Sequence, residues 1–232
     1  LSDRLNAMSQ AIALDDELLR NSTGNEVDAL ARSVDALPMD LLRTRSQTTP
    51  SEENYRSTAV LYLHLNSLVD YVDTLDEKAL HRYTTRIHQV VYAAAGFYAG
   101  DLQVSRQFGL TVFFTGDNSA GSAGFRAASC AWLIKHVGIE VEKHMSLSMS
   151  ISMAISQSEL GVGDGSDIYP GLYMQSTLDE LQSLCANRPP KILLSPALCE
   201  DVDVASRLEF HETELLNYHM LEGLVGTYQD LL

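Results

Sequence analysis

Histidine and cysteine are the residue types in this sequence that could bind a metal ion or act in covalent catalysis. The 232 residues include seven histidines and three cysteines. His81 and His88 could share a helix face, and so could His211 and His219, although the latter pair fits two strands better. Neither pair has a third ligand at a metal-binding spacing, and no cysteine belongs to a CxxC pair. We therefore expect no metal site and a set of free thiols.

One histidine, His64, lies inside the apolar run TAVLYLHL, which is typical of a strand buried on both faces. Two interpretations remain open: a core histidine with satisfied polar atoms, or a pH-sensitive group that contacts a ligand. The sequence has no GxSxG elbow, HExxH helix or P-loop, and the glycine-rich stretch LGVGDGSD fits no dinucleotide fingerprint. No motif therefore indicates a hydrolase, a protease or a kinase.

The charge of the chain argues against two classes of partner. Sixteen basic and thirty-one acidic residues give a net charge of −15. This charge repels phosphate backbones and anionic headgroups, so we expect no nucleic-acid binding and no electrostatic attachment to lipid. No apolar stretch is long enough to span a bilayer, and the odd number of cysteines fits a reducing cytoplasm. The sequence begins at Leu1 without a signal-peptide pattern, so we expect it to be part of a longer protein.

The elements that would position these side chains fall into two parts. Residues 1–46 predict two short helices whose apolar residues form narrow seams at spacings of three and four. Such seams need partner helices, most simply from a second copy of the chain. Residues 47–57 are polar, contain Pro50 and are expected to form a linker.

Residues 58–232 predict a larger domain. Strands are expected at 58–65, 97–105, 108–116, 145–156, 191–195, 207–210, 218–221 and 227–232, and helices at 72–96, 122–137, 170–185 and 195–202. The segment 145–156 alternates large apolar with small residues, which predicts a strand whose serine face meets either solvent or a closely packed backbone. The order predicts an α+β fold with helices on one face of a mainly antiparallel sheet. We expect a dimer partner to cover the other face.

Two families share local sequence with these parts. NEVDALARSVDAL and DRLNAMSQAIAL resemble HAMP linkers, which form parallel helical bundles between a membrane span and a cytoplasmic output domain. TAVLYLHLNSLV, AGDLQVSRQFGLTVFF, LQSLCANRPPKILLSPAL and LEGLVGTYQDLL resemble, in order, segments of the class III adenylate/guanylate cyclase homology domain. The resemblance implies the ferredoxin-like cyclase fold over residues 58–232, preceded by an α-helical hairpin.

The resemblance also implies that the catalytic positions are degenerate. In that family two aspartates bind two divalent metals, which activate the attacking hydroxyl and neutralise the triphosphate. On this alignment His64 and Phe108 replace the two aspartates, and Ser67 and Leu68 replace a glycine–phenylalanine pair. Val104 replaces the base-selecting lysine, while Ser176 and Glu180 replace the asparagine and arginine of an NxxxR motif. Only His64, Ser67 and Val104 remain as candidates for a residual nucleotide groove.

Other carboxylates could substitute only with difficulty. Asp70 follows the first strand, and Asp101 stands seven residues before the hairpin turn, about 20 Å away along an extended strand. Residues 58–232 contain ten basic and twenty-one acidic residues, a net charge of −11 that disfavours a triphosphate. The GG[DE]EF turn of diguanylate cyclases is absent as well.

The sequence therefore predicts a non-catalytic signal-transduction module without cofactors, the cytoplasmic part of a membrane signalling protein on the cytoplasmic side of the inner membrane. It would relay a conformational signal through a cyclase-like homodimer to a protein partner, with membrane contact only through a missing N-terminal part. The alternatives are an active cyclase with rearranged metal ligands, a nucleotide-binding sensor without turnover, and a monomeric scaffold.

Overall fold

The computed structural model describes residues 58–104, 108–158, 172–186, 191–215 and 217–225. The predicted HAMP-like segment, the linker, the glycine-rich loop and the strand expected at 227–232 lie outside the described residues. None of the helices in the described part has the length and hydropathy that a bilayer-spanning segment needs.

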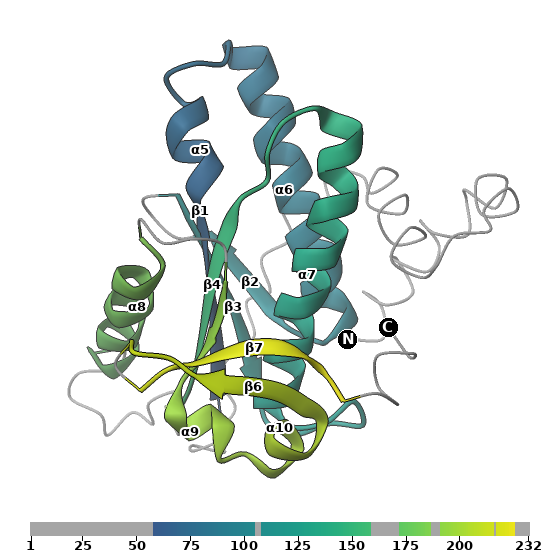
Figure 1. The fold of residues 1–232 in the computed structure, drawn as a ribbon. Helices are drawn as coiled ribbons and strands as arrows, with labels where there is room; N and C mark the ends of the chain where they lie inside the picture. The colour runs from purple at the N-terminus through teal and green to yellow at the C-terminus, as the bar shows by residue number, and fades with distance from the viewer. Residues whose placement is uncertain (1–57, 105–107, 159–171, 187–190, 216, 226–232) are drawn as a thin grey trace, which may run out of the picture.

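A seven-stranded sheet lies at the centre of the described part, with the strand order β2-β3-β1-β4-β5-β7-β6 (Figure 1). The strands are β1 Thr58–Leu65, β2 Asp101–Val104, β3 Gly109–Thr115, β4 Ile151–Ser158, β5 Ile192–Leu194, β6 Leu208–Glu212 and β7 His219–Leu224. β4 and β5 pair in parallel, and every other neighbouring pair is antiparallel. The predicted α+β class and mainly antiparallel sheet are confirmed.

Side-chain caps fix where several of the helices begin. The helices are α5 Asn66–Tyr71, α6 Glu77–Phe97, α7 Ala123–Met145, α8 Leu172–Cys185, α9 Pro196–Cys199 and α10 Val202–Arg207. Asp76 caps α6 by accepting a 2.8 Å hydrogen bond from the backbone N–H of Ala79. Ser122 caps α7 in the same way, and Ser195 caps α9 with Pro196 in the first turn.

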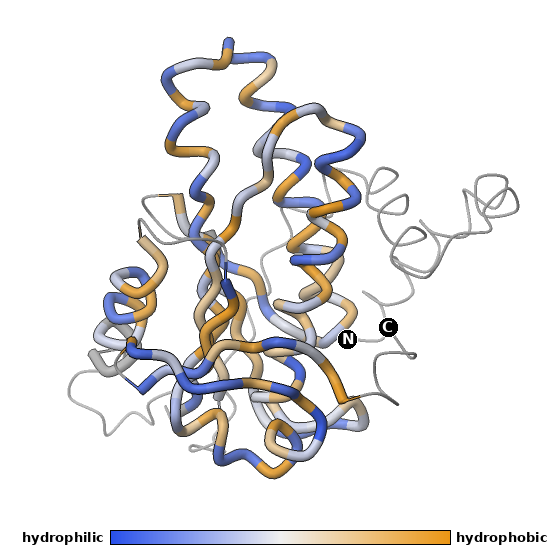
Figure 2. The backbone as a smooth tube through the Cα atoms, in the orientation of Figure 1, coloured by the Kyte–Doolittle hydropathy of each residue, from blue (hydrophilic) through white to orange (hydrophobic). Residues whose placement is uncertain are grey.

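Helices cover both faces of the sheet, which corrects the expectation of helices on one face only. Leu61 and Leu63 of β1 pack in the same core as α6 and α7. Tyr62 points to the opposite face, where it packs with Leu181 of α8. All eight residues of β1 are buried because each face has its own helical layer within one chain. Figure 1 shows α8 across the sheet from α7, and Figure 2 shows hydrophobic residues concentrated in the central strands.

The alternating segment 145–156 forms a strand only in its second half. α7 continues to Met145 and ends at Ser146, whose φ of 58° is left-handed, and β4 begins at Ile151. The backbone of Ser148 between them donates to the hydroxyl of Tyr71 at 2.9 Å and accepts from the hydroxyl of Tyr83 at 2.8 Å. The strand predicted for residues 145–150 is therefore wrong, because tyrosines from the α5 and α6 region hold this connector instead of a neighbouring strand.

Candidate functional site

The structure brings together the ends of β1 and β3, where sequence reasoning placed His64 and Phe108. His64 lies opposite Gly109 in the antiparallel register, and the backbone N–H of Leu65 donates to the carbonyl oxygen of Phe108 at 2.9 Å. Phe108 adopts a left-handed backbone with φ of 64°, and its side chain is 38% exposed. The backbones at these two positions are therefore neighbours in the fold.

The side chains at these positions do not fit a pair of magnesium ions. Mg²⁺ prefers carboxylate oxygen and water, and the phenyl ring of Phe108 has no ligand atom. His64 is 9% exposed, its Nδ1 lies 3.5 Å from the hydroxyl of Tyr62, and burial lowers its pKa below the usual value. Across the described ranges no three His, Cys, Asp or Glu side chains are grouped closely enough to hold a metal ion.

Tyr62 fills the space beside His64. The two rings stack with centroids 6.4 Å apart, and burial raises the pKa of Tyr62 to about 12. A Cβ added at Gly109 would lie 2.8 Å from Cε2 of Tyr62, so glycine is required where the tyrosine ring crosses β3. The rings of Tyr62 and His64 therefore occupy this part of the sheet face that α8 covers.

Ser67 and Asn66 fasten the start of α5 to the region around β4. The hydroxyl of Ser67 accepts a 2.8 Å hydrogen bond from the backbone N–H of Ser150, and Asn66 Nδ2 donates to Ser152 Oγ at 2.6 Å. Ser152 is 2% exposed. These contacts favour close packing over solvent exposure for this part of the serine face. They also give the hydroxyl of Ser67 a structural role, because it holds the backbone of Ser150.

Of the two carboxylates that could substitute as metal ligands, Asp101 lies away from the two strand ends. Asp101 pairs with Phe113, four residues along β3 from Gly109, or about 13 Å. Asp70 is exposed on α5. Val104, the third groove candidate, pairs through its backbone with Leu110 in the β2–β3 ladder.

The two candidate positions on α8 lie on the Tyr62 face of the sheet. Ser176 is exposed there. Glu180 accepts a 2.9 Å hydrogen bond from the hydroxyl of the buried Tyr218, which precedes β7. Burial raises the pKa of Tyr218, and the Glu180 carboxylate adds to that effect. Glu180 therefore connects α8 to the residue before β7 on the same face of the sheet, and it places a negative charge at the position where the resemblance implies an arginine.

A small cavity lies on the same face, next to the register partner of His64. Ser152, Cys185 and Leu193 are among the residues that line it, and its volume is about 200 Å³. Pockets that bind drug-sized ligands range from about 300 to 1,000 Å³. The single chain thus has a recess at this place that is smaller than a typical pocket for a drug-sized ligand.

The remaining histidines are dispersed over the fold. His81 is exposed on α6, and burial lowers the pKa of His88 on the same helix. His211 lies on β6, where its Nδ1 is 2.8 Å from Glu222, and His219 lies on β7 against the ring of Phe210. The prediction that the segment containing His211 and His219 forms two strands is confirmed.

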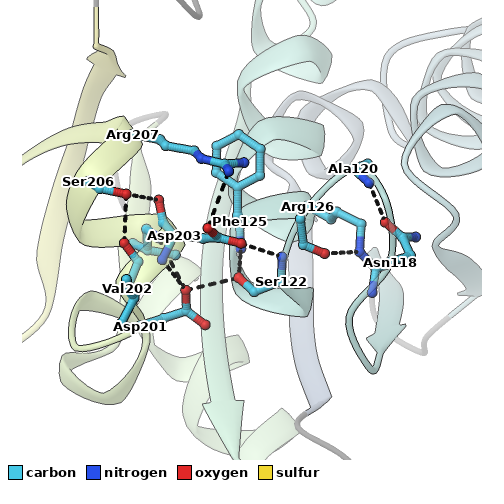
Figure 3. A network of polar contacts seen from close by, with 12 residues as sticks. Asn118, Ala120, Ser122, Phe125, Arg126, Asp201, Val202, Asp203, Ser206 and Arg207 are labelled. Carbon is cyan, nitrogen blue, oxygen red and sulfur yellow. Dashed lines mark hydrogen bonds and ion pairs between the residues drawn. The ribbon is translucent and has the colours of Figure 1, made fainter.

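Sequence reasoning missed the best-connected polar groups. Arg126 of α7 is 1% exposed and donates to backbone carbonyls that include those of Tyr98 at 3.2 Å and Thr115 at 3.1 Å. The hydroxyl of Ser122 donates to Asp201 at 2.9 Å, which joins the start of α7 to the start of α10 (Figure 3). The signal that could have indicated the role of Arg126 is its position as a lone arginine in the small-residue run AGFRAASCA. The hydrogen bond between Ser122 and Asp201 joins residues far apart in sequence, and no local pattern indicates it.

Comparison with known proteins identifies solved structures that have a similar fold. No protein-family model matches the sequence, and no curated protein matches it either. The adenylyl cyclase CyaB from P. aeruginosa is 15% identical, with 76% of this chain and 97% of that chain covered at a TM-score of 0.58. The guanylyl cyclase Cya2 is 15% identical, with 75% and 95% covered at a TM-score of 0.56.

A third similar structure is described as a non-canonical dimeric guanylyl cyclase domain of the RhoGC fusion protein from the aquatic fungus Blastocladiella emersonii. It is 13% identical, with 75% of this chain and 98% of that chain covered at a TM-score of 0.58. Another structure of that fungal domain is described as monomeric. The described part of this chain therefore has the fold of class III adenylyl and guanylyl cyclase domains.

Proposed function

We propose that this chain is a non-catalytic signal-transduction module built on the cyclase fold. The observation that carries the proposal is the pair of residues at the adjoining ends of β1 and β3, His64 and Phe108, in place of the two metal-binding aspartates that the resemblance implies. Ser67, Ser176 and Glu180 also differ from the catalytic residues that the resemblance implies, which supports the same proposal. Several independent catalytic roles are lost together, which a single alignment error would not produce.

The module belongs to the cytoplasmic part of a membrane signalling protein, on the cytoplasmic side of the inner membrane. The HAMP resemblance of residues 1–46 supports this placement, because such segments connect membrane spans to output domains. The module acts as a homodimer that passes a conformational signal to a protein partner. The exposed Phe108, together with a cyclase-domain relative described as dimeric, supports association through this end of the sheet.

Incubation of the purified chain with ATP or GTP and Mn²⁺ tests the proposal. We expect no cyclic nucleotide above a protein-free blank. Robust formation that is lost in both Asp70→Asn and Asp101→Asn would establish an active cyclase with rearranged ligands and overturn the proposal. Arg82→Gln, a change of an exposed α6 residue, is the matched surface control.

Two further measurements separate the remaining alternatives. Light scattering at micromolar concentration should give the mass of a dimer, whereas a monomer would indicate a scaffold. A thermal-shift screen with nucleotides should give no specific stabilisation. A rise of several degrees with one nucleotide would identify a nucleotide-binding sensor, because ligands that bind only the folded state raise the melting temperature.

A further inference from the structure

A larger cavity lies on the opposite side of the sheet from the candidate site. It is lined by residues of α7, of the connector before β4, and of the start of β4 and β5, and its volume is about 340 Å³. This volume is within the usual range for small-molecule pockets. Its walls are mainly apolar and include Ile134 of α7 together with Met149 and Ile151.

Gly138 keeps one wall of this cavity open. A Cβ added at this residue would meet no atom within 4 Å. Glycine inside a helix costs about 0.5–1 kcal/mol relative to alanine, and α7 has room for a side chain here. Close packing of the helix against a neighbour therefore does not explain this glycine.

The polar groups of the cavity differ between its two ends. Lys135 of α7 is seven residues from Glu142, about 10 Å along the helix axis. Glu142 accepts hydrogen bonds from the backbone N–H of Met149 and, at 3.2 Å, from the hydroxyl of Ser148, so it lies at the connector end. The other end contains Lys191, whose carbonyl accepts from Met153 at 2.9 Å.

The cationic end is unusual for a chain with a net charge of −15. The sequence has four lysines, and two of them, Lys135 and Lys191, line this cavity. Neither forms an ion pair with another described residue. With Glu142 the cavity has a formal charge of +1, which matches a single negative charge on a ligand.

We propose that this cavity binds a small amphiphilic carboxylate. The acid group lies between Lys135 and Lys191, and the apolar body extends along Gly138 and Ile151 toward Glu142. Burial of the apolar body supplies most of the affinity, and the two ammonium groups select the charge and the orientation.

The single tryptophan of the chain provides a direct signal. Nζ of Lys135 lies 5.2 Å from the ring centroid of Trp132, so a bound acid group changes the surroundings of this fluorophore. Titration of the full chain with octanoate, below its micelle concentration, should change Trp132 fluorescence in a saturable way. Calorimetry on the same samples should report the same affinity.

Substitutions of residues that line the cavity test whether octanoate binds there. Gly138→Leu fills the open space, so we expect octanoate binding to be lost while the chain stays folded and its thermal stability is unchanged or higher. Lys191→Gln should weaken octanoate binding by about tenfold. Lys78→Gln, which changes a lysine on α6 outside the cavity, should have no effect.

Three results would overturn the proposal. They are the absence of saturable octanoate binding in calorimetry, octanoate binding that persists in a folded Gly138→Leu variant, and binding of octylamine as tight as that of octanoate. These outcomes do not depend on whether the chain is a cyclase, because none of the measurements involves a nucleotide.

Discussion

The backbone N–H of Leu65 lies 2.9 Å from the carbonyl oxygen of Phe108 and donates a hydrogen bond to it. This bond extends the β1–β3 ladder beyond His64 and joins the two strand ends at which the cyclase resemblance implies metal-binding aspartates. The two positions at which the resemblance implies aspartates are therefore neighbours in the fold, and they carry an imidazole and a phenyl ring. A buried imidazole and an exposed phenyl ring are poorly suited to bind magnesium, which supports the non-catalytic relay that we propose.

The left-handed backbone of Phe108 can be tested through stability. Left-handed geometry costs an L-residue about 1–2 kcal/mol, and glycine avoids this cost. We expect Phe108→Gly to raise the free energy of unfolding of the monomeric chain by up to about 1 kcal/mol, as measured by urea denaturation at a protein concentration too low for association, because the exposed ring has little packing to lose within one chain. Phe97→Gly, a change of another exposed phenylalanine at the end of α6, should give no gain. A loss of stability in Phe108→Gly would show that the ring is packed.

Arg126 should be among the most sensitive positions in the fold. Its guanidinium donates to the carbonyls of Tyr98, Thr115 and Gly116, which end α6 and β3. Arg126→Met removes these hydrogen bonds, including the one to the buried carbonyl of Tyr98, so we expect a loss of about 3 kcal/mol or more in the free energy of unfolding. Arg126→Lys should recover only part of this loss, since one ammonium group cannot reach all the carbonyls.

The control for this prediction is Arg82→Met on the exposed surface of α6, which should change the free energy of unfolding by less than about 0.5 kcal/mol. Urea denaturation followed by circular dichroism measures both variants. Equal effects of Arg126→Met and Arg82→Met would contradict the structural role of Arg126.

Ser122 and Asp201 should be coupled energetically. Ser122 caps α7 and donates to Asp201, which itself caps α10 by accepting from the backbone N–H of Asp203 and Val204. Ser122→Ala and Asp201→Ala should each cost about 1–2 kcal/mol. The double variant should cost about 1 kcal/mol less than the sum, because the shared bond is lost only once.

A double-mutant cycle measures this coupling. The pair Ser122→Ala with Asp70→Ala is the control, since Asp70 lies on α5 and has no part in the caps, and its effects should add. Additive effects for Ser122 and Asp201 would mean that the hydrogen bond in Figure 3 contributes nothing measurable.

The free energy of unfolding should fall as the pH is lowered from about 7.5 to 5.5. Burial lowers the pKa of His64, His88 and His136 below the ordinary value of 6.5. The unfolded chain then binds protons at a higher pH than the folded chain, so stability rises with pH through this window and is lost on acidification. Urea midpoints at the two pH values measure the effect.

His88→Gln should reduce this pH dependence, and His81→Gln, at an exposed position on the same helix, should leave it unchanged. A folded His88→Gln variant with the same pH dependence as the original chain would contradict this assignment.

Local sequence was sufficient to predict most of the individual elements. The run at β1 indicated a strand buried on both faces, and Pro196 after Ser195 indicated the start of α9. These signals work because strand burial and helix capping depend on a few adjacent residues. Residues 145–150 show the limit of such reasoning: their alternation resembled a strand, but contacts with Tyr71 and Tyr83, distant in sequence, determine their structure.

The sequence by itself determined which chemical groups are available: an imidazole and a phenyl ring at the positions that the cyclase resemblance assigns to aspartates, and few lysines in an acidic chain. Only the tertiary structure decided that His64 and Phe108 adjoin, that α8 covers the face expected to need a partner, and that Lys135 and Lys191 line one cavity. The physical reason is that residue type and periodicity report what a side chain can do and whether it is buried. Its neighbours depend on strand register and helix packing, which join residues far apart in the chain.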